Sequence, residues 1–187
     1  MKVGKGQYGY NAHLRKVTIL KTVLFFGVSI ALFIAGYIQT GTRNNVLTVA
    51  AILGCLPASK SAVIMIMAFC AKGCSRETAD LVKAYENKIC LLYDCYMTSE
   101  KKSFDIACMA VTREYIYGYT ENSKTEISVA EKHIQDILKA NKKPSIPVKI
   151  LNDKNTFVQR LQDMEKNAEV DINEVAELAN ILKAISL

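Results

Sequence analysis

Acidic residues are absent from the first 74 positions of this 187-residue chain. All 18 Asp and Glu lie from Glu77 onward, whereas eight of the 24 Lys and Arg residues fall within the first 74 positions. The rest of the chain therefore holds 16 basic and 18 acidic side chains, a balance of −2. A nucleic-acid-binding domain would itself carry the basic charge. The net charge of +6 belongs to the N-terminal segment, which argues against nucleic acid as a partner.

Motifs for catalysis and for cofactors are also lacking. No glycine-rich phosphate loop follows a strand-like segment, and the chain has neither a nucleophile elbow nor a zinc-protease helix. Only two histidines are present, His13 and His133, and His133 fits a partly exposed helix surface. We therefore expect no cofactor, and a non-enzymatic protein is favoured over an enzyme.

The cysteines show no spacing typical of a compact disulfide framework. Cys70 and Cys74 lie four residues apart just after an apolar segment, where they could share a metal or carry a lipid. Two ligands do not make a closed zinc site, so packing at the membrane edge is the favoured interpretation. The remaining cysteines are expected to be reduced thiols, and the six are Cys55, Cys70, Cys74, Cys90, Cys95 and Cys108.

A long apolar run is present at residues 17–38, VTILKTVLFFGVSIALFIAGYI, and its single charge is Lys21. About 20 helical residues cross the ~30 Å hydrocarbon core of a bilayer, so this segment predicts a transmembrane helix. A cleaved signal peptide is disfavoured, because the run is long for an apolar signal region and no small-residue cleavage site follows.

A second apolar segment covers residues 46–71 and is interrupted by Pro57 and Lys60. One interpretation is a single transmembrane helix with a kink at Pro57. The other is a pair of half-helices that re-enter the same side of the membrane. Lys60 falls near the middle of the segment, where a charge costs ~2.5–3.5 kcal/mol on insertion scales. It predicts a polar contact within an oligomer, a lipid phosphate ligand or a water-filled crevice. The other interpretation is a side chain that reaches outward beside the kink, where local water makes the charge tolerable.

Charge distribution predicts the orientation of this hairpin. Basic residues precede the first segment and follow the second, whereas the connecting loop 39–45 holds only Arg43. The positive-inside rule then places both termini in the cytoplasm. We accordingly divide the chain into a basic cytoplasmic tail at 1–16, a transmembrane hairpin at 17–74 and a soluble domain at 75–187.

The soluble domain has the alternating periodicities of a small α+β fold. Residues 75–87 predict a helix with Ser75 as its N-terminal cap. Residues 88–98 alternate Ile89, Leu91, Tyr93, Cys95 and Met97, which we interpret as one face of a central strand. The expected order is helix, three strands, helix, strand and two helices, over 75–87, 88–98, 104–111, 115–120, 126–141, 148–150, 155–167 and a last helix after a capping box at 171–174.

Two carboxylates, Asp94 and Asp105, fall in neighbouring predicted strands. Two carboxylates close together can bind a divalent cation or hold a raised pKa. They are therefore the candidate metal ligands of the chain, although two solvated side chains near strand ends are the more common outcome.

The order of elements from 75 to 151 resembles the core of the restriction-endonuclease-like PD-(D/E)XK nucleases. The resemblance places Asp105, in SFDIACMAV, where that family has the Asp of its second strand. The third strand reads YIYGYT and lacks the family's Glu-x-Lys, which supplies the second carboxylate and the lysine that metal-assisted hydrolysis needs. The resemblance therefore implies a shared fold without cleavage; a different α+β domain is the other interpretation.

These observations predict a membrane-anchored interaction or regulatory protein with a cytoplasmic α/β domain. Its expected partners are the membrane and either another protein or further copies of itself. The alternatives are a metal-dependent nuclease relative without activity, and lipid or small-molecule handling at Lys60.

Overall fold

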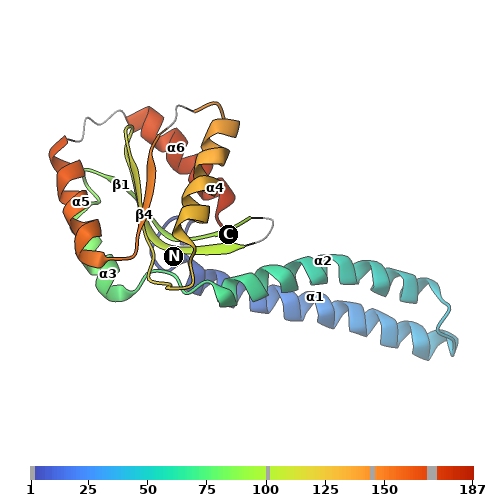
Figure 1. Cartoon of the computed structure of the whole chain (residues 1–187). Helices are drawn as coiled ribbons and strands as arrows, with labels where there is room; N and C mark the ends of the chain where they lie inside the picture. Colours follow the sequence, from blue (N-terminus) through green and yellow to red (C-terminus); the bar gives the residue numbers. More distant parts are fainter. Residues whose placement is uncertain (1–2, 100–101, 144–145, 168–171) are drawn as a thin grey trace. The chain divides into compact units, whose positions relative to one another are not determined.

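The computed structural model describes residues 3–99, 102–143, 146–167 and 172–187, and it divides into two compact units. Residues 12–70 form a helical hairpin, and residues 1–11 together with 71–187 form an α/β domain. The predicted capping box at 171–174 falls partly outside the described residues. Figure 1 shows both units, coloured along the chain.

The hairpin consists of α1 (Tyr10–Thr40) and α2 (Val46–Cys70). The first helix begins seven residues before the predicted start, so residues 10–16 of the predicted basic tail are helical. The second is one helix with Pro57 inside it, not two half-helices. Both are long and apolar enough to span a membrane, and only 17% of the apolar window of each is buried.

Every facing pair in the seam between the two helices includes at least one small residue. Arg15 Nε donates to the Ala68 carbonyl at 2.7 Å, and Thr22 Oγ1 donates to Ser61 Oγ at 3.0 Å. Each step along the seam advances seven residues on α1 and retreats seven on α2, as in an antiparallel coiled coil. The facing pairs are Arg15 with Ala68, Thr22 with Ser61, Ser29 with Gly54 and Gly36 with Leu47.

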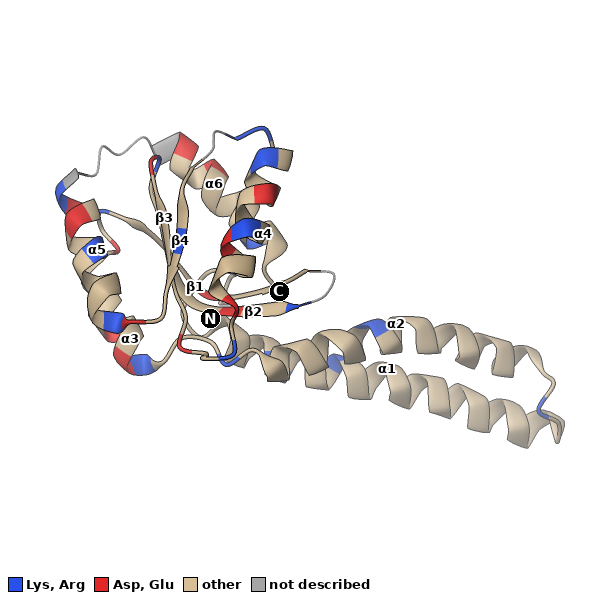
Figure 2. Cartoon of the chain, in the orientation of Figure 1, with Lys and Arg blue, Asp and Glu red and all other residues tan. Residues whose placement is uncertain are grey.

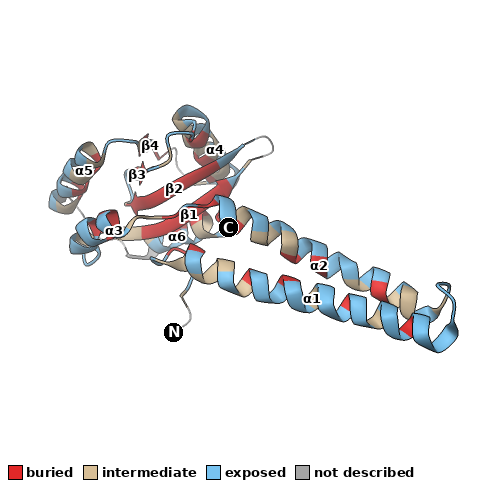
Figure 3. Ribbon diagram, turned by 90° about the horizontal axis from the view of Figure 1, so that it is seen from below, coloured by how far each residue is buried: buried red, intermediate tan, exposed pale blue. Residues whose placement is uncertain are grey.

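Most residues of the hairpin are exposed or half-buried (Figure 3). The outer surface that they form is apolar, so the polarity of the hairpin is the reverse of that of a water-soluble helix pair. Thr18, Thr22, Ser29 and Ser61 are buried, whereas large side chains such as Leu20 (68% exposed) face outward. Among the described residues, all but four of the exposed large hydrophobic side chains lie in this hairpin; the four are Tyr8, Leu81, Tyr115 and Val129.

The domain is built on one four-stranded mixed sheet in the order β1-β2-β3-β4. The strands are β1 (Cys90–Thr98), β2 (Ser103–Val111), β3 (Ile116–Tyr119) and β4 (Val148–Leu151). The first three are joined by hairpins and are antiparallel, whereas β3 and β4 are parallel because α4 (Ile127–Ala140) connects them.

Helices cover both faces of the sheet, and the predicted order of elements is confirmed. Helix α4 and α6 (Ile172–Ile185) pack on one face, where Ile134, Leu138 and Leu182 are buried. On the other face lie α3 (Arg76–Val82), which continues as the 3₁₀ turn η1 (Lys83–Tyr85), and α5 (Lys154–Asn167). We call the two layers the α4/α6 core and the α3/α5 core.

The prediction that residues 88–98 form a central strand is wrong in position. Strand β1 lies at an edge of the sheet, and it is apolar on both faces because both helix layers cover it. Its outer edge is paired by the chain ends. Tyr93 N donates to the Gly6 carbonyl at 2.9 Å, and Leu187 N donates to the Tyr96 carbonyl at 2.8 Å. An edge strand is thereby closed to other chains.

The predicted single face of β1 is also wrong. Tyr93 belongs to the α3/α5 core with Ile89, whereas Cys95 and Met97 belong to the α4/α6 core. The change falls at Asp94, whose φ of +55° is in the left-handed region. A strand alternates strictly only while its backbone stays extended, so this residue shifts the alternation by one position.

Candidate functional site

The carboxylates of Asp94 and Asp105 meet at one short stretch of backbone. Both side chains are buried, each 5% exposed, on neighbouring strands. Both accept hydrogen bonds from residues 72–74, which follow α2 in the chain. The prediction that they lie near one another therefore holds, and we call this arrangement the carboxylate clasp.

Asp94 holds both chain segments that lead to the hairpin. Its Oδ1 accepts the Cys74 N–H at 2.7 Å, and its Oδ2 accepts the Asn11 N–H at 3.2 Å. Segments that are 63 residues apart in sequence are thus bound to opposite oxygens of one side chain. Buried backbone N–H groups need such acceptors, because leaving one unpaired costs ~1–3 kcal/mol.

Asp105 completes the clasp from β2. Its Oδ2 accepts the Lys72 N–H at 2.9 Å, and its Oδ1 accepts the Gly73 N–H at 3.4 Å. Burial raises the pKa of this carboxyl; the two backbone N–H groups act in the opposite direction, and the nearby Asp94 carboxyl raises it further. The peptide groups of residues 72–74 thus supply the positive ends of dipoles that two buried acids require.

These contacts decide what the pair can do chemically. Each of the four carboxylate oxygens accepts one backbone N–H, so the two acids have protein partners for their charge without a bound cation. Within the described ranges, no three His, Cys, Asp or Glu side chains gather as a metal-ligand group. The geometry is that of a structural clasp.

Gly73 can occupy its place in the carboxylate clasp because it has no side chain. Its φ is +77°, a conformation that L residues rarely adopt, and a Cβ there would lie 2.7 Å from Asp94 Oδ1. The close approach lets residues 72–74 present consecutive N–H groups to the two acids.

Gly73→Ala is expected to lower the free energy of unfolding by about 3 kcal/mol, because left-handed strain adds to displacement of the Asp94 carboxylate. Gly9→Ala is the matched control, since Gly9 has φ +82° and nothing within 4 Å of a built Cβ; strain alone predicts about 1 kcal/mol. Labelling of the buried thiols Cys95 and Cys108 in the full-length protein in detergent measures opening. If Gly73→Ala and Gly9→Ala lowered the free energy of unfolding equally, close contact of Gly73 with Asp94 would not contribute to stability.

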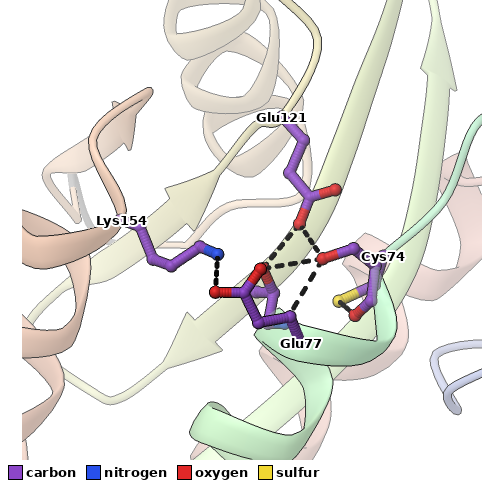
Figure 4. Close-up of polar contacts among 6 residues, drawn as sticks. Cys74, Glu77, Glu121 and Lys154 are labelled. Carbon is purple, nitrogen blue, oxygen red and sulfur yellow. Dashed lines mark hydrogen bonds and ion pairs between the residues drawn. The ribbon is translucent and has the colours of Figure 1, made fainter.

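A second polar cluster lies beside the clasp at the start of α3 (Figure 4). Glu121 Oε1 accepts hydrogen bonds from Ser75 Oγ at 2.7 Å and from Thr78 Oγ1 at 2.6 Å. Ser75 also caps α3 through the Thr78 N–H, as predicted. Glu121, two residues after the end of β3, has no place in the sequence predictions. Here it ties the end of β3 to the start of α3.

An ion pair joins α3 to α5 at the same edge. Lys154 Nζ lies 2.9 Å from Glu77 Oε1, and Figure 4 shows the pair next to Glu121. Both partners reach solvent, so the pair is worth little on its own. It adds a contact between two helices of the α3/α5 core.

The two cysteines for which packing at the membrane edge was the favoured interpretation, Cys70 and Cys74, belong to different units. Cys70 is the last residue of α2 and is exposed, whereas Cys74 belongs to the α/β domain. Burial, followed by the nearby Glu121 and Asp94 carboxyls, raises the pKa of the Cys74 thiol to about 12. Cys74 is therefore a neutral thiol at physiological pH, and neutral thiols are poor metal ligands and nucleophiles.

The domain carries a pocket of about 520 Å³ beside α3. Tyr8 and Tyr93 form one wall, with their rings edge to face at 6.2 Å. Arg76 of α3 and Lys83 of η1 also line the pocket. Glu86 accepts the Tyr93 hydroxyl hydrogen bond at 2.7 Å and fixes that ring. The full lining is Tyr8, Arg76, Ala79, Asp80, Lys83, Glu86 and Tyr93.

The intramembrane candidates Lys60 and Pro57 are both exposed on the outer surface of the hairpin. Figure 2 shows that this unit carries isolated basic positions and no acidic ones. Lys60 therefore has no acidic partner within the hairpin.

Comparison with known protein families, curated proteins and solved structures finds no match to this chain.

Proposed function

We propose that this chain is an integral membrane protein whose helical hairpin anchors a non-enzymatic interaction domain at the cytoplasmic surface. The reversed polarity of the hairpin carries the proposal. Its seam holds small and polar residues, and its outer surface is apolar. In water such a surface would be costly, at roughly 25 cal/mol per Å² of exposed apolar area. In a bilayer it is the stable arrangement, and close packing of small residues holds the helices together.

The charge distribution supports placing the domain in the cytoplasm. Four basic residues occupy positions 1–16, and Lys72 and Arg76 follow α2, whereas the loop between the helices has only Arg43. The positive-inside rule then keeps both ends of the hairpin, and the domain that follows, on the cytoplasmic side.

An interaction role accounts for the chemistry of the domain. The two buried acids are engaged by backbone N–H groups, so they act in holding the fold. The pocket beside α3 combines two tyrosines with Arg76 and Lys83, for which no ion pair is recorded among the described residues. Tyr and Arg are the residues that most often dominate binding energy at protein interfaces. We take this pocket as the docking point for a protein partner or a second copy.

Alkaline carbonate tests the anchor, and crosslinking in native membranes tests the docking point. The full-length protein is expected to stay in the membrane fraction at high pH. Arg76→Glu with Lys83→Glu is expected to lower the crosslinked fraction about tenfold, because reversed charges oppose the partner's complementary field.

Lys132→Glu with Lys139→Glu is the matched control for this charge reversal. Both lysines are exposed, and they have the same seven-residue spacing on α4, on the other face of the sheet. Differently tagged copies distinguish self-association from another partner. An equal loss in both double variants would contradict docking at the α3 pocket, and release by carbonate would contradict the anchor.

The order of elements favours a second candidate, a PD-(D/E)XK nuclease relative without activity. The domain runs α3, β1, β2, β3, α4, β4, and Asp105 lies on β2. On this proposal the acid is retained as part of the clasp. Titration of the full-length protein with Mn²⁺ is expected to give no heat dependent on Asp105. Heat that Asp105→Asn abolishes, together with DNA cleavage, would favour an active metal site instead.

A further inference from the structure

The seam of the hairpin fixes the relative height of its two lysines. Lys21 immediately precedes Thr22, and Lys60 immediately precedes Ser61, the residue that Thr22 hydrogen-bonds at 3.0 Å. In this register Lys21 is level with residue 62 of α2, two residues from Lys60. At 1.5 Å per residue, the two lysines differ in height by only about 3 Å. They lie toward the end of the hairpin that holds residues 12 and 70.

The two lysines also share a face. Antiparallel helices of the same hand turn in opposite senses when viewed down a common axis. The residue just before a seam position on one helix therefore points to the same side as the residue just before the facing position on the other. Lys21 and Lys60 occupy these two positions, and both are exposed. Helices that pack through small residues lie about 8 Å apart, so two lysine side chains of about 6 Å can converge.

Nothing in the hairpin neutralises this pair. Acidic residues are absent from positions 1–76, and the helix surface around the lysines is apolar, with exposed Val23, Leu56 and Val63. Two ammonium groups on an apolar face are costly unless a counter-ion joins them. Lys21 lies four residues, about 6 Å, inside the predicted start of the first apolar segment at residue 17, so a lysine side chain can extend from there to the headgroup layer. A bilayer offers a suitable counter-ion in that layer, the phosphate of a lipid headgroup, whose chains also fit the apolar face.

We propose that Lys21 and Lys60 together bind the phosphate of one lipid headgroup, which makes the hairpin a phospholipid-binding site as well as an anchor. This inference rests on the proposed membrane insertion. It revises the position of Lys60, which acts with Lys21 near one headgroup layer and not alone at the membrane centre. The two cations favour phospholipids with net negative charge, because a zwitterionic headgroup brings its own ammonium.

Native mass spectrometry of the full-length protein, reconstituted with phosphatidylglycerol and phosphatidylcholine, tests the site. The wild type is expected to retain phosphatidylglycerol preferentially. Lys21→Gln and Lys60→Gln should each reduce that preference several-fold, and the double variant about tenfold, which is about 1.4 kcal/mol. Lys16→Gln with Arg43→Gln is the control, since it removes the same charge elsewhere in the hairpin.

The outcomes separate the site from the anchor. Unchanged preference in the double variant, with the protein still resistant to carbonate, would overturn the lipid site and leave the anchor intact. Release of the wild type by carbonate would overturn the anchor and the site with it. Inorganic phosphate is included as a competitor; loss of bound phosphatidylglycerol at millimolar phosphate would show a site for free phosphate and overturn the lipid assignment.

Discussion

Asp94→Ala is expected to lower the free energy of unfolding of the α/β domain by about 4 kcal/mol. The substitution leaves the buried N–H group of Asn11 and the partly buried N–H group of Cys74 without an acceptor, at ~1–3 kcal/mol each. It also places alanine at a φ of +55°, which Asp tolerates better than a residue with no side-chain acceptor. Asp94→Asn should cost about half as much, because one oxygen acceptor and the tolerance of the left-handed conformation remain.

The rate at which the buried thiols Cys95 and Cys108 are labelled measures this effect, because both are shielded until the domain opens. Asp136→Ala on the exposed side of α4 is the control, with an expected change within about 0.5 kcal/mol. A labelling rate for Asp94→Ala equal to that of the control would contradict the clasp. If Asp94→Asn lowered the free energy of unfolding more than Asp94→Ala does, the oxygen acceptors would not be the source of the stability.

The sequence predicted the elements well because their signals are local. Within residues 126–141 the apolar positions Ile127, Ala130, Ile134, Ile137 and Leu138 form one helical stripe, which predicts α4. Three of them, Ala130, Ile134 and Leu138, are buried. Ser75 predicted the start of α3 through a cap that depends only on its neighbours. The two apolar helices followed from length and composition alone. Such features need no knowledge of distant partners.

The carboxylate clasp could be predicted only in part. Its acceptors are carboxylate side chains, which the sequence shows, whereas its donors are backbone N–H groups, which the sequence does not distinguish. The alternation of apolar residues predicted that Asp94 and Asp105 lie in adjacent strands, and the pairing of β1 with β2 confirms it. Their partners could not be predicted, since any residue except proline carries an N–H. The positive φ at Asp94 also leaves no mark on the alternation of apolar residues. For this reason the sequence pattern wrongly placed Cys95 on the same face as Tyr93. The hydrogen bond between Gly6 and Tyr93 of β1 joins two segments far apart in the chain, and no pattern in the sequence predicts that they pair.

The seam of the hairpin, by contrast, has a signal that periodicity could have found. Thr22, Ser29 and Gly36 recur every seven residues on α1, and Gly54, Ser61 and Ala68 do the same on α2. A search for small and polar residues at this spacing, in place of large apolar ones, identifies the contact face of a membrane hairpin. The height of Lys60 relative to Lys21 follows from that register, which the sequence of α2 by itself does not give.

Gly54→Ile is expected to separate the two helices of the hairpin. A Cβ on Gly54 would lie 2.7 Å from Ser29 Oγ, and the helix backbones cannot keep their spacing around a branched side chain. The lost packing, about 2 kcal/mol, is a large share of the association energy of two membrane helices, which have no hydrophobic drive toward each other inside lipid. Gly27→Ile on α1 is the matched control, since a Cβ there meets nothing within 4 Å and the position is exposed.

Disulfide formation between Thr22→Cys and Ser61→Cys reports the seam directly, because these side-chain oxygens are 3.0 Å apart. With Cys55 and Cys70 replaced by serine, the engineered pair is expected to oxidise rapidly in membranes. Gly54→Ile should slow that reaction at least tenfold, and Gly27→Ile should leave it unchanged. Equal rates in the two variants would contradict the small-residue seam. The shared height of Lys21 and Lys60 depends on the same register, so that result would also remove the geometric basis of the two-lysine phosphate site.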